Sequence, residues 1–290
     1  MGSSGLALHE GGERVVTAMK ARELGRKSVV VGDEAGLVGD VSGGPDSLAR
    51  IVRVAPRRTV LRRTADDTDP VERMVVANAE QLVIVTAVAD PVPRTGFVDR
   101  CLVAAYAGGL SPLLCLTKAD LADPGPFAAQ YAELELPVLV TRRDEPQRLT
   151  ALADVLAGRV SAFVGHSGVG KSTLVNALVP DADQMVGRVS GVGKGRHTTV
   201  AALALPLPAD RGGWVVDTPG VRSFGLAHVT PDAVIAAFDD LAAAIDDCPR
   251  GCGHLGPPAD PECALDTLVE QGQLRAGRLA ALRRVLVALR

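Results

Sequence analysis

Residues Gly165 to Thr173 constrain the fold more than any other stretch of the chain. They read Gly-His-Ser-Gly-Val-Gly-Lys-Ser-Thr and fit the phosphate-loop pattern G-x-x-x-x-G-K-[ST] at every fixed position. The apolar run 160–164 predicts a buried strand before the loop, and residues 171–179 predict a helix that ends at Pro180. In this context backbone N–H groups and the helix N-terminus can bind phosphate oxygens. The alternative is an ordinary glycine turn at the start of a helix, which the complete strand–loop–helix context disfavours.

The loop pattern assigns a role to each of its residues. Lys171 is predicted to contact the β- and γ-phosphates of a nucleotide and to act in catalysis, and the Ser172 hydroxyl is predicted to bind Mg²⁺. The other predicted nucleotide contacts in the loop are Gly165, His166, Ser167, Gly168, Val169, Gly170 and Thr173.

Apolar runs alternate with helical patterns on both sides of the loop. We predict strands over 82–88, 112–116, 138–140, 200–207 and 213–216, and helices over 97–107, 127–135 and 147–156. This alternation predicts a doubly wound α/β sheet, in which ligands bind at the carboxyl ends of the strands.

The rest of the chain has a different pattern. Short β-like runs at 15–17, 28–31, 37–38, 51–54 and 59–61 predict a small barrel or sandwich, and we assign the first residues of the chain no structural role. A polar linker is predicted over 64–70. From residue 230 onward we predict helices around a stretch rich in glycine and proline. We therefore expect three domains, with the limits 1–66, 71–229 and 230–290.

The sequence Thr117-Lys118-Ala119-Asp120 follows a predicted strand and resembles the base-reading motif N-K-x-D of GTPases. An aspartate at a strand end can accept hydrogen bonds from the ring N–H and the exocyclic amine of guanine, a donor pair that adenine lacks. The Lys118 stem can cover the base, whereas Thr117 removes an amide that could bridge to neighbouring groups. A helix cap after a strand is the alternative for this short motif. With the phosphate loop, the motif predicts GTP and GDP as ligands.

Two further stretches are predicted to lie near the γ-phosphate. Asp217 follows an apolar strand and is predicted to bind Mg²⁺, and the Gly220 N–H is predicted to contact the γ-phosphate. Thr198 and Thr199 end a glycine-rich segment, and a threonine there can bind Mg²⁺ when a triphosphate is present. A mobile connector is the alternative for residues 187–199.

The order of these motifs is unusual. The base-reading motif stands about 45 residues before the phosphate loop, whereas ordinary small GTPases place it after the D-x-x-G motif. The same sheet can form if the chain ends are moved elsewhere, so the order predicts a circular permutation.

Four residues near the C-terminus form a metal-ligand set. Cys248, Cys252, His254 and Cys263 supply three thiolates and one imidazole, which suits a closed tetrahedral site for one structural Zn²⁺. No position is left open for water, so we do not expect catalysis at this metal. Reduced cysteines in a loop are the alternative.

Charge and hydropathy exclude some classes of protein. The net charge of −3 gives no overall attraction to nucleic acid, and no apolar run approaches the roughly 20 residues of a membrane span. Two blocks of arginines without a neighbouring acid can bind phosphates, or can be solvated surface. The first block comprises Arg50, Arg53, Arg57, Arg58, Arg62 and Arg63, and the second comprises Arg275, Arg278, Arg283, Arg284 and Arg290.

With its motifs in this order, the chain resembles the RsgA/YjeQ family of circularly permuted GTPases. The likeness lies in 117–120, 165–173, 195–199, 217–226 and the cysteine–histidine set. It implies an N-terminal OB-type barrel, a permuted GTPase domain and a C-terminal zinc domain. It also implies a monomeric cytoplasmic GTPase that binds the 30S subunit and 16S rRNA late in subunit maturation, with hydrolysis stimulated by the subunit.

Three features depart from that family, and one affects mechanism. The N-terminal segment is short for a five-stranded barrel, Thr117 replaces asparagine, and the gap before Cys263 is long. In addition, Val221 stands where many GTPases have a glutamine that orients water, so intrinsic hydrolysis should be slow. Our hypothesis is that His197, or a group supplied by the ribosome, positions the attacking water.

Two other functions remain open from the residues alone. The first is a nucleotide-dependent switch that recruits a protein partner, with hydrolysis incidental. The second is an ATP-using kinase or transport ATPase, which Asp120 disfavours.

Overall fold

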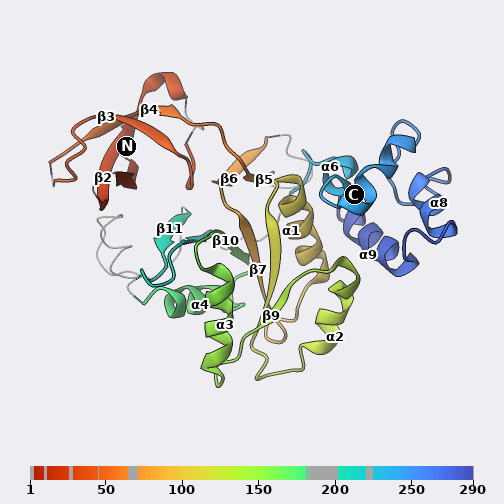
Figure 1. Cartoon of the computed structure of the whole chain (residues 1–290). Coiled ribbons are helices and arrows are strands. Elements are labelled where there is room, and N and C mark those ends of the chain that lie inside the picture. The colour runs from red at the N-terminus through yellow and green to blue at the C-terminus, as the bar shows by residue number, and fades with distance from the viewer. Residues whose placement is uncertain are drawn as a thin grey trace.

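The computed structural model describes residues 3–9, 12–25, 29–44, 46–64, 71–180, 182, 202–219 and 225–289. A small N-terminal sheet lies at one end of the molecule, a larger mixed sheet lies in the middle, and C-terminal helices lie on the far side of that sheet (Figure 1). Among the described residues, no helix combines the length and the apolar character needed to cross a membrane.

The central sheet has six strands in the order β11-β12-β10-β7-β8-β9. Their bounds are β7 Gln81–Ala87, β8 Ser111–Thr117, β9 Val138–Val140, β10 Val160–Gly165, β11 Leu203–Pro206 and β12 Trp214–Asp217. The strands from β12 to β9 are mutually parallel, and β11 pairs antiparallel with β12 at one edge. The predicted α/β sheet is thus confirmed, and each of its predicted strands is present.

The strand that leads into the phosphate loop confirms the permuted order. β10 lies between β7 and β12, and β8 lies on the other side of β7. In the chain, however, β7 and β8 both precede β10. The strand that carries the base-reading motif therefore comes first in the chain but lies two strands from the phosphate loop in the sheet.

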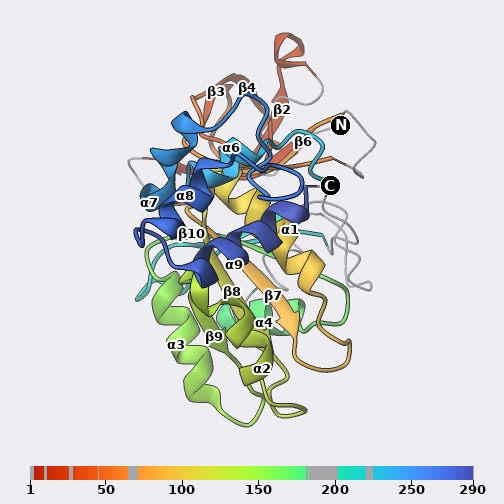
Figure 2. The same ribbon diagram turned by 90° about the vertical axis from the view of Figure 1, so that its right-hand side faces the viewer.

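Helices bury both faces of this sheet. Helix α1 (Thr95–Ala107) packs against β7 and β8 on one face, where α6 (Pro231–Ile235) and α9 (Ala276–Val287) pack against α1 in turn. In Figure 2, α9 crosses the front of the molecule beside α1. Helices α3 (Pro146–Leu156) and α4 (Lys171–Leu178) cover the other face.

Alternate residues of the central strands enter two separate cores. Leu82 and Ile84 of β7 belong to the core beneath α1, whereas Val83 and Val85 belong to the core beneath α3 and α4. All four are fully buried, which explains why β7 is a continuous apolar run rather than an alternating one.

The remaining helical segments follow the predictions closely. The predicted helix over 127–135 is a short helix α2 (Gly125–Ala128) continued by a 3₁₀ helix (Ala129–Leu134). The C-terminal region contains α6, α7 (Asp239–Ala242), a 3₁₀ turn (Ala244–Asp247), α8 (Ala264–Glu270) and α9.

The N-terminal region corrects three of our predictions. Its sheet has the order β1-β2-β4-β3, with the bounds Ser3–His9, Gly12–Lys20, Ala49–Val54 and Ala35–Gly39 respectively. The first residues, to which we assigned no structural role, form β1 and pair antiparallel with β2 along its whole length. The available signal was the alternation of Leu6 and Leu8, which is short and lies among small residues.

The prediction of a strand over 28–31 is wrong, because the described residues 29–31 form no strand. The Asp33 carboxylate accepts a hydrogen bond from the Val30 N–H (2.8 Å), so this donor is not available to a sheet. Val31 forms only an isolated bridge, with Val76. Apolar residues thus lie in a turn that an aspartate side chain organises.

The strand predicted over 59–61 exists but does not belong to the N-terminal sheet. It is β5 (Val60–Arg63), and it pairs with β6 (Arg73–Ala77), a strand that the sequence did not predict. The predicted linker over 64–70 lies outside the described residues except for Thr64, which bridges to Gly225.

A buried ion pair joins the N-terminal sheet to the segment before β5. Arg57 Nε and Nη2 donate to the two carboxylate oxygens of Asp33 at 2.6 and 2.9 Å, and the Asp33 side chain is only 1% exposed. Next to this pair, Asn78 accepts from the Arg58 N–H and donates to the Gly32 carbonyl, both at 2.9 Å. The turn around Asp33 is therefore hydrogen-bonded to the end of β6.

Seven arginines of the two blocks form ion pairs with acids from other segments of the described chain. The pairs are Arg57 with Asp33, Arg58 with Glu34, Arg62 with Glu72, Arg275 with Glu133, Arg278 with Asp240, Arg283 with Asp266 and Arg284 with Asp99. The side chains of four of them are mostly buried in these pairs, namely Arg57, Arg278, Arg283 and Arg284. The other three pairs lie on the solvated surface, at Arg58, Arg62 and Arg275.

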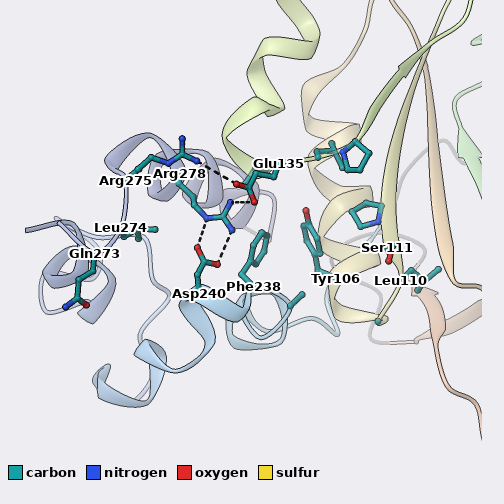
Figure 3. Close-up of a pocket in the computed structure, with 16 residues that line it drawn as sticks. Tyr106, Leu110, Ser111, Glu135, Phe238, Asp240, Gln273, Leu274, Arg275 and Arg278 are labelled. Atoms are coloured by element: carbon teal, nitrogen blue, oxygen red, sulfur yellow. Dashed lines mark hydrogen bonds and ion pairs between the residues drawn. The ribbon is translucent and has the colours of Figure 1, made fainter. Parts of the chain in front are cut away.

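Arg278 shows how one such pair supports the C-terminal helices. It lies in a groove of about 850 Å³ between the central sheet and these helices, and its side chain is 13% exposed. Its guanidinium binds both Asp240 oxygens, at 2.7 and 3.0 Å, and lies 5.7 Å from the Phe238 ring centroid (Figure 3). Glu135 is a further partner at 3.7 Å. These contacts attach α9 to α7 and to the end of the 3₁₀ helix before β9.

The Asp33–Arg57 pair predicts a selective loss of stability. Replacing Asp33 by alanine removes the carboxylate that pairs with the largely buried Arg57 guanidinium and should lower the free energy of unfolding by about 3 kcal/mol. Glu34→Ala is the matched control, because the Arg58–Glu34 pair is mostly exposed and should be worth about 0.5 kcal/mol. Urea unfolding followed by circular dichroism measures both losses, and equal losses would contradict a structural role for the buried pair.

Candidate nucleotide site and metal centre

The phosphate loop lies between β10 and α4 at the carboxyl end of the parallel strands. Gly168 and Gly170 have φ values of +85° and +92°, a region that residues with a Cβ rarely adopt. A Cβ at Gly165 would lie 2.7 Å from the Val85 carbonyl oxygen, so β7 approaches the loop too closely for a side chain. The fixed glycines of the motif are therefore required by the backbone geometry.

Lys171 is the first residue of α4 and is almost buried, with 8% of its side chain exposed. Its ammonium donates to a carboxylate oxygen of Asp217 and, at 2.8 Å, to the Thr218 carbonyl oxygen. The structure thus brings the predicted phosphate-binding lysine and the predicted Mg²⁺-binding aspartate into direct contact. A Mg²⁺–triphosphate carries both an anion for Lys171 and a cation for Asp217, so it can replace this ion pair.

Thr117 connects the base-reading strand to the phosphate loop. Its side chain is buried, and its hydroxyl donates to the Val169 carbonyl oxygen at 2.5 Å. The Thr86 carbonyl oxygen, at 3.4 Å, is a more distant acceptor for the same hydrogen. Threonine lacks the amide that an asparagine would provide here, but its hydroxyl makes one bridge of its own, to the phosphate loop.

The other two residues of the motif lie at the end of β8. Lys118 has a φ of +57° and donates through its ammonium to the Asp90 carbonyl oxygen. Asp120 is exposed, whereas Ala119 before it is buried. An exposed carboxylate at the carboxyl end of a strand remains available to a ligand.

The segment after β9 lies beside this motif, and our sequence analysis did not assign it to the site. The Thr141 N–H donates to the Leu116 carbonyl oxygen at 2.7 Å, and the Ala119 N–H donates to the Thr141 carbonyl oxygen at 3.4 Å. The sequence could have indicated this neighbour. Residues 141–142 follow the predicted strand 138–140, and the carboxyl end of that strand lies at the same edge of the sheet as the base-reading motif.

A second unassigned residue contacts the loop itself. The ring centroids of Phe97 and His166 lie 4.0 Å apart, so the first turn of α1 packs against the phosphate loop. Burial lowers the pKa of His166 below its ordinary value, and the nearby Arg94 lowers it further. A neutral imidazole is therefore favoured at neutral pH.

Not every predicted site residue lies in the described part of the chain. Ser167, Ser172 and Thr173 are exposed around the loop and the first turn of α4. His197, Thr198, Thr199 and Gly220 lie outside the described residues, as does Val221.

The cysteine–histidine set converges as its spacing predicts. The ligand atoms of Cys248, Cys252, His254 and Cys263 all lie within 4.8 Å of one another. His254 Nδ1 is 3.4 Å from Cys248 Sγ and 3.9 Å from Cys263 Sγ. A tetrahedral Zn²⁺ with ordinary bond lengths separates such nitrogen and sulfur ligands by about 3.6 Å. The cluster is therefore compatible with a Zn²⁺ site.

Backbone donors around the cluster favour thiolates. The Ala264 N–H donates to Cys248 Sγ and the His254 N–H donates to Cys252 Sγ, both at 3.3 Å. Without a cation, burial raises the pKa of Cys252 to about 12, and the neighbouring thiols add to this. A bound metal ion would supply the charge that keeps these sulfurs deprotonated.

Comparison with known protein families gives a match over most of the central region. The profile of the RsgA GTPase family matches residues 54–227. A small ribosomal subunit biogenesis GTPase RsgA from Alcanivorax borkumensis is 40% identical over 243 residues, which cover 81% of this chain and 67% of the relative. The protein of the same name from Ectopseudomonas mendocina is 40% identical over 247 residues, with coverages of 82% and 70%.

Solved structures with the same fold extend this similarity to the whole chain. The crystal structure of YjeQ from Thermotoga maritima has a TM-score of 0.65 at 25% identity and covers 100% of this chain and 99% of its own. The structure of YloQ, described as a circularly permuted GTPase, has a TM-score of 0.63 at 22% identity and covers 100% of this chain and 95% of its own.

The Thr117–Val169 hydrogen bond predicts a specific loss of nucleotide affinity. Thr117→Val keeps the shape but leaves the Val169 carbonyl oxygen without its donor, which should cost about 1–2 kcal/mol and weaken GDP binding about tenfold. Thr117→Ser keeps the hydroxyl and should bind nearly as tightly as the parent. Calorimetric titration with Mg²⁺–GDP measures both variants, and unchanged affinity in Thr117→Val would contradict the role of this bond.

Proposed function

The chain belongs to the RsgA GTPase family, and we propose on that basis that it hydrolyses GTP on the small (30S) ribosomal subunit late in subunit maturation. Membership makes the chain a GTP hydrolase that uses Mg²⁺. Binding to the 30S subunit, stimulation by it, contact with 16S rRNA, a monomeric state and a cytoplasmic location are parts of the proposal.

One observation carries the proposal: the ends of β12 and β8 are each hydrogen-bonded to the phosphate-loop motif that follows β10. Lys171 contacts Asp217 and Thr218, and Thr117 contacts Val169. Groups suited to phosphate, Mg²⁺ and guanine therefore meet at one edge of a permuted sheet, although 100 positions of the chain separate Thr117 from Asp217.

We assign the roles of the residues in hydrolysis as follows. Mg²⁺ would be held by Ser172 and Asp217, with Thr198 or Thr199, and it would neutralise charge on the β- and γ-phosphates. Lys171 would stabilise the negative charge that develops as the γ-phosphoryl group leaves. The Gly220 N–H would contact the γ-phosphate, and Asp120 would select guanine.

The metal centre and the domain limits complete the proposal. Cys248, Cys252, His254 and Cys263 would hold one structural Zn²⁺, which the compatible geometry of the four ligands supports. We propose domains at 1–66, 71–229 and 230–290, with RNA contacts in the first and last.

The ion pairs of the arginines narrow the surface that could bind rRNA. Arg50 and Arg53 of β4 are exposed, and neither forms an ion pair with another described residue. Guanidinium groups in this state can contact phosphates without breaking an internal interaction. We therefore propose that these two arginines contribute to 16S rRNA binding.

A turnover assay with and without purified 30S subunits tests the proposed function. GTP hydrolysis should be slow alone and should rise by about tenfold or more with subunits, because Val221 stands where many GTPases have a glutamine that orients water. Lys171→Ala should be inactive in both conditions. Equal rates with and without subunits would contradict the proposal.

Subunit binding should also fall steeply with salt if RNA phosphates are contacted. Arg50→Ala and Arg53→Ala should weaken it, whereas Arg58→Ala, whose partner is Glu34, serves as the control. Binding that is insensitive to salt would favour the alternative in which the nucleotide state recruits a protein.

The turnover assay with 30S subunits also tests His197. His197→Ala should abolish the stimulated turnover and spare GTP binding. Unchanged stimulated turnover would exclude His197 as the water-positioning group.

A further inference from the structure

The metal-ligand histidine has a second partner that the cysteine–histidine pattern does not include. His254 is 2% exposed, and its two ring nitrogens face different groups. Nδ1 faces the sulfur atoms of Cys248 and Cys263, whereas Nε2 lies 2.7 Å from the Asp232 Oδ1. The two nitrogens therefore have separate roles, one toward the metal position and one toward a carboxylate.

The carboxylate determines which nitrogen can bind a metal. An ionised Asp232 can only accept a hydrogen bond, so Nε2 must carry the proton in this contact. The lone pair of the neutral imidazole is then on Nδ1, which points at the sulfur cluster. Hydrogen bonds of this kind orient metal-binding histidines and raise the basicity of the ligating nitrogen.

Asp232 is well placed to hold the ring, because the short helix that carries it is firmly packed. Thr230 caps α6 by accepting a hydrogen bond from the Ala233 N–H. Val234 and Ile235 are fully buried, and α6 packs against α1. The side chain of Asp232 itself is 68% exposed, so the carboxylate loses little hydration while it binds His254.

The backbone of His254 is held from another direction. Arg283 of α9 donates from Nε to the His254 carbonyl oxygen at 3.0 Å and binds both Asp266 oxygens, at 2.7 and 2.8 Å. His254 also has a φ of +57°, an unusual conformation for a residue with a side chain. Contacts from α6 and α9 thus fix both the ring and the main chain of this ligand.

We infer that Asp232 is the positioning residue of the metal centre: it orients His254 for Zn²⁺ binding through Nδ1 and so attaches the metal site to α6, the first helix after the Asp217 segment. This inference rests on the proposed Zn²⁺ site. Asp232 does not contact the metal position, and its contribution is made through His254.

The affinity of the full-length chain for Zn²⁺ tests the inference, measured by competition with a chelator of known affinity. Asp232→Leu removes the acceptor and should weaken Zn²⁺ binding by about 10- to 100-fold. Asp232→Asn keeps a neutral acceptor and should show a smaller loss. Asp246→Asn is the matched control, because it removes an exposed acid close to Cys248 in the chain that makes no hydrogen bond or ion pair with a described residue. It should bind Zn²⁺ like the parent.

Two further readouts separate positioning from a general loss of structure. The visible spectrum of the Co²⁺-substituted chain should change in Asp232→Asn but not in Asp246→Asn, since the spectrum depends on ligand geometry. GDP affinity should be the same in all variants. If Asp232→Leu does not fold, the comparison of Asp232→Asn with Asp246→Asn tests the role of Asp232. Equal Zn²⁺ affinities and equal Co²⁺ spectra in these two variants would overturn the inference.

The outcome also distinguishes this inference from the proposed Zn²⁺ site. If the parent chain binds no Zn²⁺, the proposed site and the inference both fail. If the parent binds Zn²⁺ and the Asp232 variants bind it equally tightly, only the role of Asp232 fails.

Discussion

The parallel alignment of β12, β10, β7 and β8 is the constraint on which the nucleotide site depends. Parallel strands bring their carboxyl ends to one edge of the sheet, whatever their order in the chain. Permutation can therefore move the base-reading strand ahead of the phosphate loop without moving it in space. Two contacts join these ends directly: Thr117 binds the loop at Val169, and Lys171 binds Asp217. The permutation also places the Asp217 strand shortly before the C-terminal helices, so the segment that we propose to contact the γ-phosphate precedes α6 in the chain.

Ion pairs between distant segments hold the peripheral parts of the chain in place. Asp33 and Arg57 join the N-terminal sheet to the segment before β5, and Arg278 joins α9 to α7. Arg284 approaches Asp99 of α1 at 3.7 Å, and burial raises the pKa of Asp99 to about 6 even beside this cation. These arginines stand in blocks without local acids, yet their partners lie elsewhere in the fold. Counting arginines in the sequence therefore overestimates how many of them are free to bind RNA.

The central sheet and the phosphate loop could be predicted from the sequence, because long apolar runs and a fixed glycine pattern are local signals. The partner of Thr117 could not, because the Val169 carbonyl becomes its neighbour only when β8 and β10 lie in one sheet. The same holds for Phe97 against His166 and for Asp232 beside His254. Two of the wrong predictions in the N-terminal region have structural explanations. Asp33 converts an apolar run into a turn, and β5 pairs with the unpredicted β6 rather than with the sheet before it.

The central claim is that these strand ends form one site that selects guanine. Competition for a fluorescent GDP analogue bound to the Mg²⁺-loaded chain tests it most directly. Unlabelled GDP should displace the analogue at one site per chain, and ADP should fail to do so at concentrations about a hundredfold higher, because adenine cannot donate two hydrogen bonds to Asp120. Equal displacement by ADP and GDP would contradict the account.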